Sequence, residues 1–205
     1  SEHGIMTTLT DLARNSAPRN VAGDIGRLFG EAIAKKIDKH LTALFGGFST
    51  TVGSASTTMS ASLIFQAVAK LRANAVPGDN LNAVIHPQVA FDLKSGLTNT
   101  FANPNPGVGN EALRSGLVGQ IAGVNIFETS NMTDSSSNDP GTTGDYKGAV
   151  FHPDALGLAM MQDLKIETQR DASLRADEIL ATAVYGLGEL DDSKGCEFEA
   201  DSSIQ

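Results

Sequence analysis

The amino-acid sequence predicts an α+β fold, in which helices and strands are grouped rather than regularly alternating. Three observations carry this prediction. A long amphipathic helix is predicted over 20–45, a segment of mixed helices and short strands follows over 51–149, and the last third of the chain has strand patterns. This order differs from the repeating βα pattern of parallel-sheet folds and is typical of α+β proteins.

The long helix has the clearest pattern in the sequence. Apolar residues recur every three or four positions from Val21 to Phe45, which makes one continuous apolar stripe. Asn20 is a favourable N-cap residue, and Gly46 and Gly47 are expected to end the helix. About 26 residues at ~1.5 Å each give a helix of ~39 Å, long enough to cross a compact chain of this size.

The segments on either side of this helix carry weaker patterns. Residues 4–12 are predicted to form a short extended strand, and the small polar residues of 49–56 are predicted to form a linker. From there to residue 149 the patterns predict, in order, a helix over 58–74, a turn at 77–79, a buried strand over 82–85, a helix over 87–96, a loop over 98–116, two short strands within 117–127 and a polar loop over 133–147.

The last third of the chain is predicted to consist mainly of strands. They are expected at 149–151, 156–161, 164–168 and 179–187, with a charged turn or loop over 169–178. Residues 189–201 are acidic and are expected to be irregular. Cys196 is interpreted as an incidental thiol in this polar segment, and a single cysteine forms no intrachain disulfide.

Charge and hydropathy limit the classes of function. The 205 residues carry a net charge of −9, which argues against a dedicated nucleic-acid-binding domain. The charge is uneven, because residues 1–127 hold 10 basic and 8 acidic residues whereas residues 128–205 hold 5 and 16. No apolar run approaches the ~18–20 residues of a transmembrane helix, so no membrane association is expected.

Motifs for catalysis, cofactors or metals are weak. Residues 107–112 match a GxGxxA dinucleotide-binding pattern, but the prolines before them prevent the central strand that such a site requires. His86 and His152 each follow an apolar strand and precede a proline, so they are interpreted as strand-end residues rather than metal ligands. An alternative is a small soluble α+β enzyme or ligand-binding domain that would use both histidines and the loop around 107–110.

Four stretches of the chain stand in a recognisable order. They are VAGDIG with AKKIDKHL at 21–26 and 34–41, VIHP at 84–87, LVGQIAGVNIFET at 117–129, and GAVFHPDAL at 148–156 with the strands that follow to Gly186. Each stretch is short, but together they span nearly the whole chain. In their order and spacing they resemble the major capsid protein of tailed bacteriophages, which has the Hong Kong 97 type of capsid fold.

The resemblance implies a long spine helix, a peripheral lobe and an axial lobe. The peripheral lobe is expected to comprise 1–50 and 150–188, and the axial lobe 51–149. The acidic C-terminal segment, 189–205, is expected to return toward the axial lobe or to cover the surface. Its acidic residues are expected mostly at the outer surface or at the seams between subunits. The family also has an N-terminal arm and an extended loop before the spine helix. The sequence starts at Ser1, and residues 1–12 resemble only the strand that returns from that loop, so both parts are expected to be missing here.

The function implied by the resemblance is structural rather than enzymatic, and no cofactor is expected. The subunit would self-assemble as hexamers and pentamers into an icosahedral head, enclosing double-stranded DNA that it contacts non-specifically. The implied location is the virion, after assembly in the host cytoplasm, with portal, scaffolding or decoration proteins as further partners. The alternative on the same fold is a nanocompartment shell protein that encloses cargo enzymes.

Two sets of charged residues are candidate functional residues. The loop over 169–178 resembles the family's loop that meets its counterparts at local threefold axes, where complementary charges would fix the choice of partner. Its candidate contact residues are Arg170, Asp171, Arg175, Asp177 and Glu178, for which a solvated loop is the alternative. On the long helix, the basic residues expected to face the shell interior are Lys35, Lys36 and Lys39.

Overall fold

The structure is a computed structural model that describes residues 1–16, 21–101, 120–132 and 145–204. Its contacts divide the chain into two compact units. Unit 1 comprises Ser1–Asp38 and Leu158–Gly188, and unit 2 comprises Lys39–Gly157 and Glu189–Gln205. The divisions at residues 38 and 157 differ from the lobe boundaries expected at residues 50 and 149.

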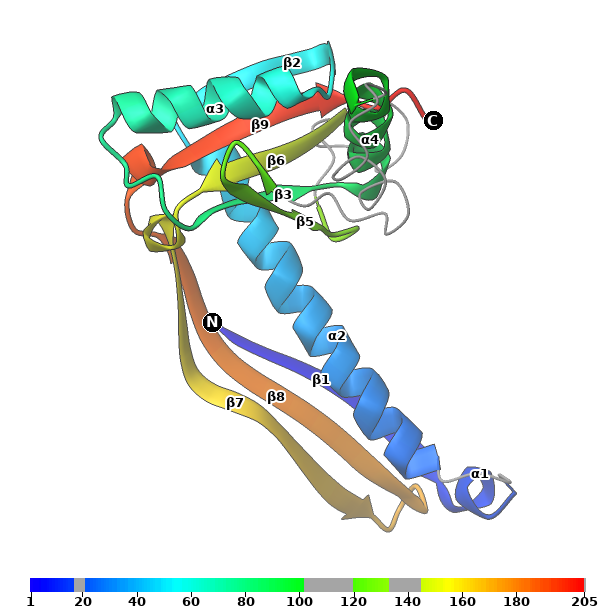
Figure 1. Cartoon of the computed structure of the whole chain (residues 1–205). Helices are drawn as coiled ribbons and strands as arrows, with labels where there is room; N and C mark the ends of the chain where they lie inside the picture. The colour runs from blue at the N-terminus through cyan, green and yellow to red at the C-terminus, as the bar shows by residue number, and fades with distance from the viewer. Residues whose placement is uncertain (17–20, 102–119, 133–144, 205) are drawn as a thin grey trace. The chain divides into compact units, whose positions relative to one another are not determined.

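Unit 1 contains a three-stranded sheet and most of a long helix (Figure 1). The strand order is β1-β8-β7, with β1 at Glu2–Thr10, β8 at Ala176–Glu189 and β7 at Leu156–Asp171. β1 and β8 are antiparallel, and Ile5 lies opposite Ala181. A short helix, α1 (Asp11–Ser16), follows β1.

The core of unit 1 lies between α2 (Val21–Ala43) and this sheet. Phe29 and Ile33 of α2 are 6% and 8% exposed and belong to one cluster with the inward-facing residues of β8. Those residues alternate along the strand, as period-2 packing requires: Ile179, Ala181, Ala183 and Tyr185. The long helix predicted from the apolar stripe is confirmed, and a 3₁₀ turn, η1 (Leu44–Gly47), closes it where the two glycines were expected to do so.

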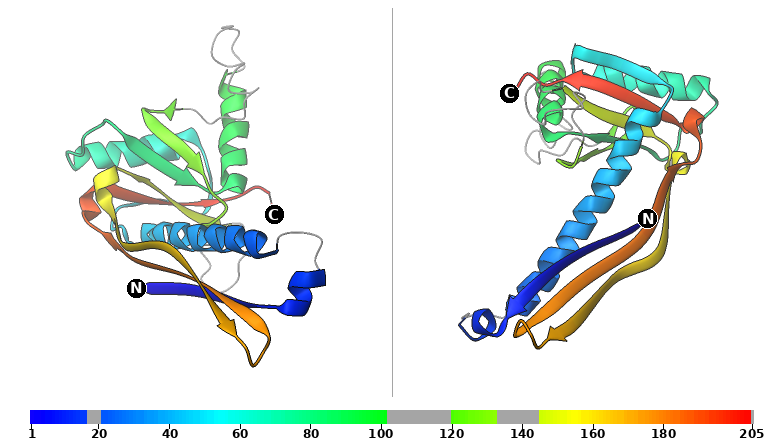
Figure 2. Two further views of the ribbon diagram at one scale, coloured as in Figure 1. Left: turned by 90° about the horizontal axis from the view of Figure 1, so that it is seen from below. Right: turned by 180° about the vertical axis from the view of Figure 1, so that it is seen from behind.

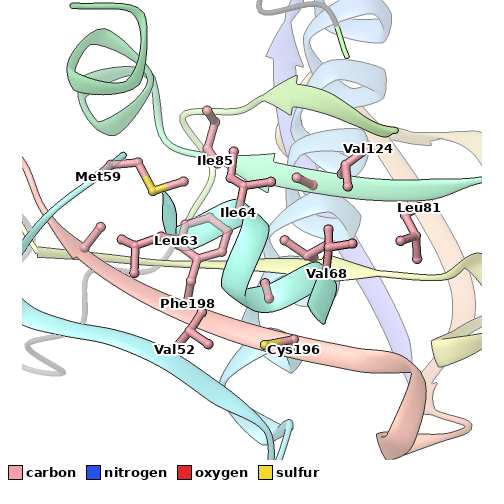
Figure 3. Close-up of a cluster of buried hydrophobic side chains, with 14 of the residues drawn as sticks. Val52, Met59, Leu63, Ile64, Val68, Leu81, Ile85, Val124, Cys196 and Phe198 are labelled. Carbon is pink, nitrogen blue, oxygen red and sulfur yellow. The ribbon is translucent and has the colours of Figure 1, made fainter. Parts of the chain in front are cut away.

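Unit 2 is built on a six-stranded mixed sheet of order β2-β9-β6-β3-β5-β4. The strands are β2 (Thr51–Thr58), β9 (Gly195–Asp201), β6 (Asp145–Phe151), β3 (Leu81–Ile85), β5 (Val124–Glu128) and β4 (Gln120–Ile121). Residues of α3 (Ala61–Ala73) and α4 (Pro87–Phe101) pack with one face of the sheet in a single large cluster. Figure 3 shows its centre, where Ile64 and Val68 of α3 lie over Phe198 and Cys196 of β9.

The acidic C-terminal segment is the main correction to the sequence-based fold. Residues 189–201 were expected to be irregular, with their acidic residues at the surface or at subunit seams, but β9 lies inside the sheet between β2 and β6. Cys196 and Phe198 are 0% and 2% exposed, so Cys196 is a core residue rather than an incidental surface thiol. The acidic residues alternate with the apolar ones, and the carboxylate of Glu197 forms an ion pair with Lys147 at 2.9 Å. The alternation of apolar and acidic residues that is typical of a strand was therefore present in the sequence, but the acidic residues led to the expectation of an irregular segment.

Other elements differ from the expectations in extent. The expected linker at 49–56 forms β2, an edge strand that pairs in parallel with β9. The two strands expected at 156–161 and 164–168 are one continuous strand, β7, and α4 runs to Phe101 rather than ending near Gly96. The predicted strand at 82–85 and the glycine turn within 117–127 are confirmed, the latter with positive φ at Ala122 and Gly123. The part of the loop expected at 133–147 that precedes β6 lies outside the described residues.

No helix in the described ranges is long and apolar enough to cross a membrane.

Burial makes a testable prediction about the thiol of Cys196. Desolvation raises the pKa of Cys196 to about 11, so little thiolate forms at neutral pH. We expect a thiol-specific reagent such as Ellman's reagent to modify the native protein at least ~100-fold more slowly than the urea-unfolded chain, since only unfolding exposes the thiolate. Equal rates in the two states would show that β9 is not held in the sheet.

Candidate subunit interface and basic helix face

The candidate interface residues gather at the β7–β8 hairpin of unit 1. Asp171 ends β7 and organises the turn, because its Oδ1 accepts hydrogen bonds from the Ser173 amide at 2.8 Å and the Ser173 hydroxyl at 2.7 Å. These bonds stabilise the carboxylate and lower the pKa of Asp171. Arg175 closes the turn with φ +48°, and its carbonyl accepts a hydrogen bond from the Asp11 amide at 3.0 Å. The turn is therefore tied both to itself and to the start of α1.

A network of four charged side chains lies beside this turn. The Arg170 guanidinium donates two hydrogen bonds of 2.7 Å to the carboxylate oxygens of Asp11, which is the two-pronged geometry that arginine and carboxylate favour. Arg170 also contacts Asp177 at 3.2 Å, and Asp177 forms an ion pair with Arg14. The hydrogen bond to Arg170 is the main cause that lowers the pKa of Asp11.

The network divides the predicted interface residues into two groups. Arg170 and Asp177 are engaged within the chain, and Asp171 holds the turn, so these three have structural partners. Arg175 is exposed at the tip, and Glu178 is half-buried on β8 opposite Thr8 of β1. Leu174, which the charge pattern did not single out, is 61% exposed beside Arg175.

Sequence reasoning missed Asp11 and Arg14 as members of this network. Asp11 is 159 positions from Arg170, and no local pattern connects them. The antiparallel pairing of β1 with β8 brings them together, because it sets Thr10 opposite Ala176. A charged residue directly after a strand was the only available signal.

The three predicted basic residues of α2 are all exposed. Lys39 is three residues after Lys36 and four after Lys35, so the three side chains lie near one another on the helix surface. Glu31, on the preceding turn of the helix, forms an ion pair with Arg27 at 3.0 Å. The lysines thus form a compact basic group on α2.

The two strand-end histidines lie at opposite ends of the β3–β6 pair. The pairing is antiparallel, with Asn82 opposite Phe151. His86 therefore follows the end of β3 near the start of β6, and His152 follows the end of β6 near the start of β3. In each histidine, Nδ1 accepts a hydrogen bond from the backbone amide two residues further along the chain. The His86 ring also stacks on the Tyr146 ring, with 3.7 Å between the ring centroids. No group of three metal-binding side chains occurs among the described residues. The GxGxxA stretch at 107–112 lies outside them.

The charged network predicts an acid-dependent loss of stability in unit 1. A carboxyl whose folded pKa is lowered contributes stability above its unfolded pKa, and this contribution is lost as the pH falls through the folded value. The stability due to Asp11 is therefore present at neutral pH and declines below about pH 4. We expect Asp11→Asn to lower stability at pH 7 and to flatten this acid decline, as measured by denaturant unfolding from pH 7 to pH 2.

The matched control is Asp24→Asn, which removes an exposed carboxylate in the first turn of α2. It should leave the acid decline in place. An Asp11→Asn variant with the same pH profile as the unmodified chain would contradict the role of the network.

Comparison with known proteins identifies the family and the fold to which this architecture corresponds. A family model described as phage capsid protein matches residues 1–196. Among solved structures, one from Mycobacterium phage Che8 is 25% identical with a TM-score of 0.81, covering 97% of this chain and 70% of that chain. The capsid structure of cyanophage P-SCSP1u is 18% identical with a TM-score of 0.78, covering 98% and 72%.

The same fold also occurs outside phages. The holo-SrpI encapsulin complex from Synechococcus elongatus PCC 7942 is 12% identical with a TM-score of 0.71, covering 100% of this chain and 75% of that chain. At this identity the likeness shows the fold alone. No curated protein sequence matches the chain. Because the family model covers nearly the whole chain, this protein belongs to the phage capsid protein family, with the fold of a tailed-phage major capsid protein.

Proposed function

We propose that this capsid protein is the repeating subunit of an icosahedral phage head, assembling as hexamers and pentamers around double-stranded DNA. The observation that carries the proposal is the family match over residues 1–196. The work of such a subunit is structural, and we propose no catalytic step for it. Its place would be the virion after assembly in the host cytoplasm, where portal, scaffolding or decoration proteins could contact it.

The surface of unit 1 supports self-association. Large apolar side chains are exposed there, and Met6, Leu12 and Met161 are 60%, 79% and 89% accessible. Burying such side chains against a partner molecule is favourable. In a shell, copies of the same chain would cover them, with contacts that repeat by symmetry.

We assign the two units to the two lobes of the capsid fold. Unit 1, with the helix and the long strands, corresponds to the peripheral lobe, and unit 2, with the six-stranded sheet, corresponds to the axial lobe. The acidic segment after Gly188 then belongs to the axial lobe, since β9 pairs with β2 and β6.

The hairpin tip is our candidate for contacts between capsomers. The network around Arg170 holds the hairpin in shape within one subunit, which leaves Arg175, Leu174 and Glu178 to meet other copies. Complementary charge at such a contact selects the partner and its register more than it adds affinity.

Substitution at the tip tests this role. Arg175→Glu should reduce the yield of shells severalfold while the subunit stays folded, because it reverses the one exposed cation of the turn. Arg175→Lys, which keeps the charge, is the control. Particle yield is measured by sedimentation and electron microscopy, and folding by circular dichroism. Arg170→Glu is the less informative variant, since it also breaks the pair with Asp11. If the Arg175→Glu variant formed normal shells, the proposal that the hairpin tip lies in an interface between subunits would be contradicted.

The basic group of α2 is our candidate for non-specific contact with packaged DNA. Lys35, Lys36 and Lys39 are exposed and close together, and phosphate contacts of this kind carry no sequence information. We propose that they face the shell interior.

Charge removal tests the assignment of these lysines. The triple variant Lys35→Gln, Lys36→Gln and Lys39→Gln should still form shells, but nucleic acid should dissociate from opened shells at lower salt, since fewer phosphates are neutralised. The measurement is the salt concentration that releases half of the bound DNA. Lys70→Gln, at an exposed lysine of α3, is the control. An unchanged midpoint in the triple variant would contradict the proposal.

A nanocompartment shell is the alternative on the same fold, favoured by the likeness to the encapsulin complex. Shells purified from a producing cell discriminate the two: packaged DNA supports the phage head, and packaged protein supports the compartment. If the complete gene product remained monomeric, both kinds of shell would be contradicted.

A further inference from the structure

The strand β7 has one edge without a partner strand in the part of the chain that the structure describes. In the order β1-β8-β7, it pairs with β8 on one side only (Figure 2). It is 16 residues long and contains no proline. Leu158, Met160, Leu164 and Ile166, which alternate along the strand, are 47%, 44%, 38% and 45% exposed. A long apolar edge strand pairs readily with another chain.

The hydrogen bonding at Leu164 shows which backbone groups face this edge. The Leu164 amide donates a hydrogen bond to Oδ1 of Asp163 at 2.8 Å, which is a partner outside the ladder with β8, and we take this amide to face the open edge. Backbone groups alternate sides along an antiparallel strand. The even-numbered residues of β7 therefore turn their amides and carbonyls toward the open edge, and Asp163 caps one of these amides.

We propose that this edge pairs with β7 of a second copy of the chain, antiparallel about a twofold axis at Leu164. The inference rests on the proposed self-assembly. Pairing about one axis is isologous, so the same residues meet from both sides. It would join two three-stranded sheets into one six-stranded sheet and pair the backbone groups of both open edges.

Strand length and charge select the axis at Leu164. It lies at the middle of Leu156–Asp171, so an axis there gives nearly complete overlap of the two strands. It also sets Asp163 opposite Lys165 of the second copy, twice. Moving the axis to Lys165 would set that lysine against itself and Asp163 against Glu167, and like charges directly opposite are unfavourable.

Asp163 has a further role in this arrangement. In the single subunit it occupies an edge amide and so hinders pairing before assembly. Within its own chain Lys165 pairs with Glu167 at 2.6 Å, whereas Asp163 forms no ion pair among the described residues. On pairing, the Asp163 carboxylate releases the Leu164 amide to the second strand and turns to Lys165 of the other copy.

A single cysteine at the axis gives a specific test. Hydrogen-bonded residues opposite each other have Cα atoms ~5.5 Å apart, which a disulfide can span. Leu164→Cys in assembled shells, oxidised with copper phenanthroline, should therefore run mainly as a covalent dimer on a non-reducing gel. Gln162→Cys should not, because two copies of residue 162 would lie ~14 Å apart along the strands. The double variant Gln162→Cys, Ile166→Cys should dimerise again.

The unmodified chain supplies the background control, since its buried Cys196 should give no dimer. If shells form but Leu164→Cys gives no dimer, or joins another segment such as β1, the edge pairing is wrong while the capsid function stands. If the unmodified chain forms no shells, the proposed function itself fails.

A charge exchange tests the register without cysteine. Asp163→Lys alone sets two lysines against each other and should lower shell yield severalfold. The double variant Asp163→Lys, Lys165→Asp restores opposite charges across the axis and should recover most of the yield, as measured by sedimentation. Failure of the double variant to recover, with both variants folded by circular dichroism, would overturn the axis at Leu164.

Discussion

The insertion of β9 between β2 and β6 is the constraint on which unit 2 depends. The strand reaches the middle of the sheet only after the chain has left unit 2, formed β7 and β8, and returned. Cys196, Phe198 and Ala200 then complete the cluster beneath α3. Because a central strand supplies hydrogen bonds on both sides and apolar contacts on one face, the unit cannot close until nearly the whole chain is present. Unit 2 is thus a fold of long-range contacts.

Unit 1 is organised differently: its three-stranded sheet packs against α2 on one face, and β1 and β7 form its two edges. Its helix covers the sheet through small residues such as Ala181 and Ala183, which let the helix approach closely. Large apolar residues outside this core, including Met161, are exposed in the single subunit. Arg170 forms ion pairs with Asp11 and Asp177 of the same chain, so contacts within the subunit hold the shape of the hairpin tip. A hairpin held by these internal contacts is consistent with the proposed role of its tip in contacts that repeat between copies.

The net charge of −9 has a different meaning once the structure is known. Several acidic residues of the last third are occupied within the fold: Glu197 pairs with Lys147, Asp171 caps its turn, and Asp192 accepts a hydrogen bond from the Ser49 amide. The exposed lysines of α2 form a separate basic group. In the proposed phage head the shell would confine nucleic acid rather than read its sequence, so a modest local group of cations is compatible with a protein that is acidic as a whole.

The sequence by itself determined the local elements: α2, α3 and β3 follow from apolar periodicity, because a helix or a short buried strand is specified by neighbours a few residues away. Only the tertiary structure decided the role of β9. Its glutamates made the segment look exposed in the sequence, whereas in the fold the charge of Glu197 is neutralised by an ion pair with Lys147. The tertiary structure likewise decided the partner of Arg170, since Asp11 is 159 positions distant. Long-range pairing brings such groups together, and the pairing depends on the register of whole strands, which no local pattern contains.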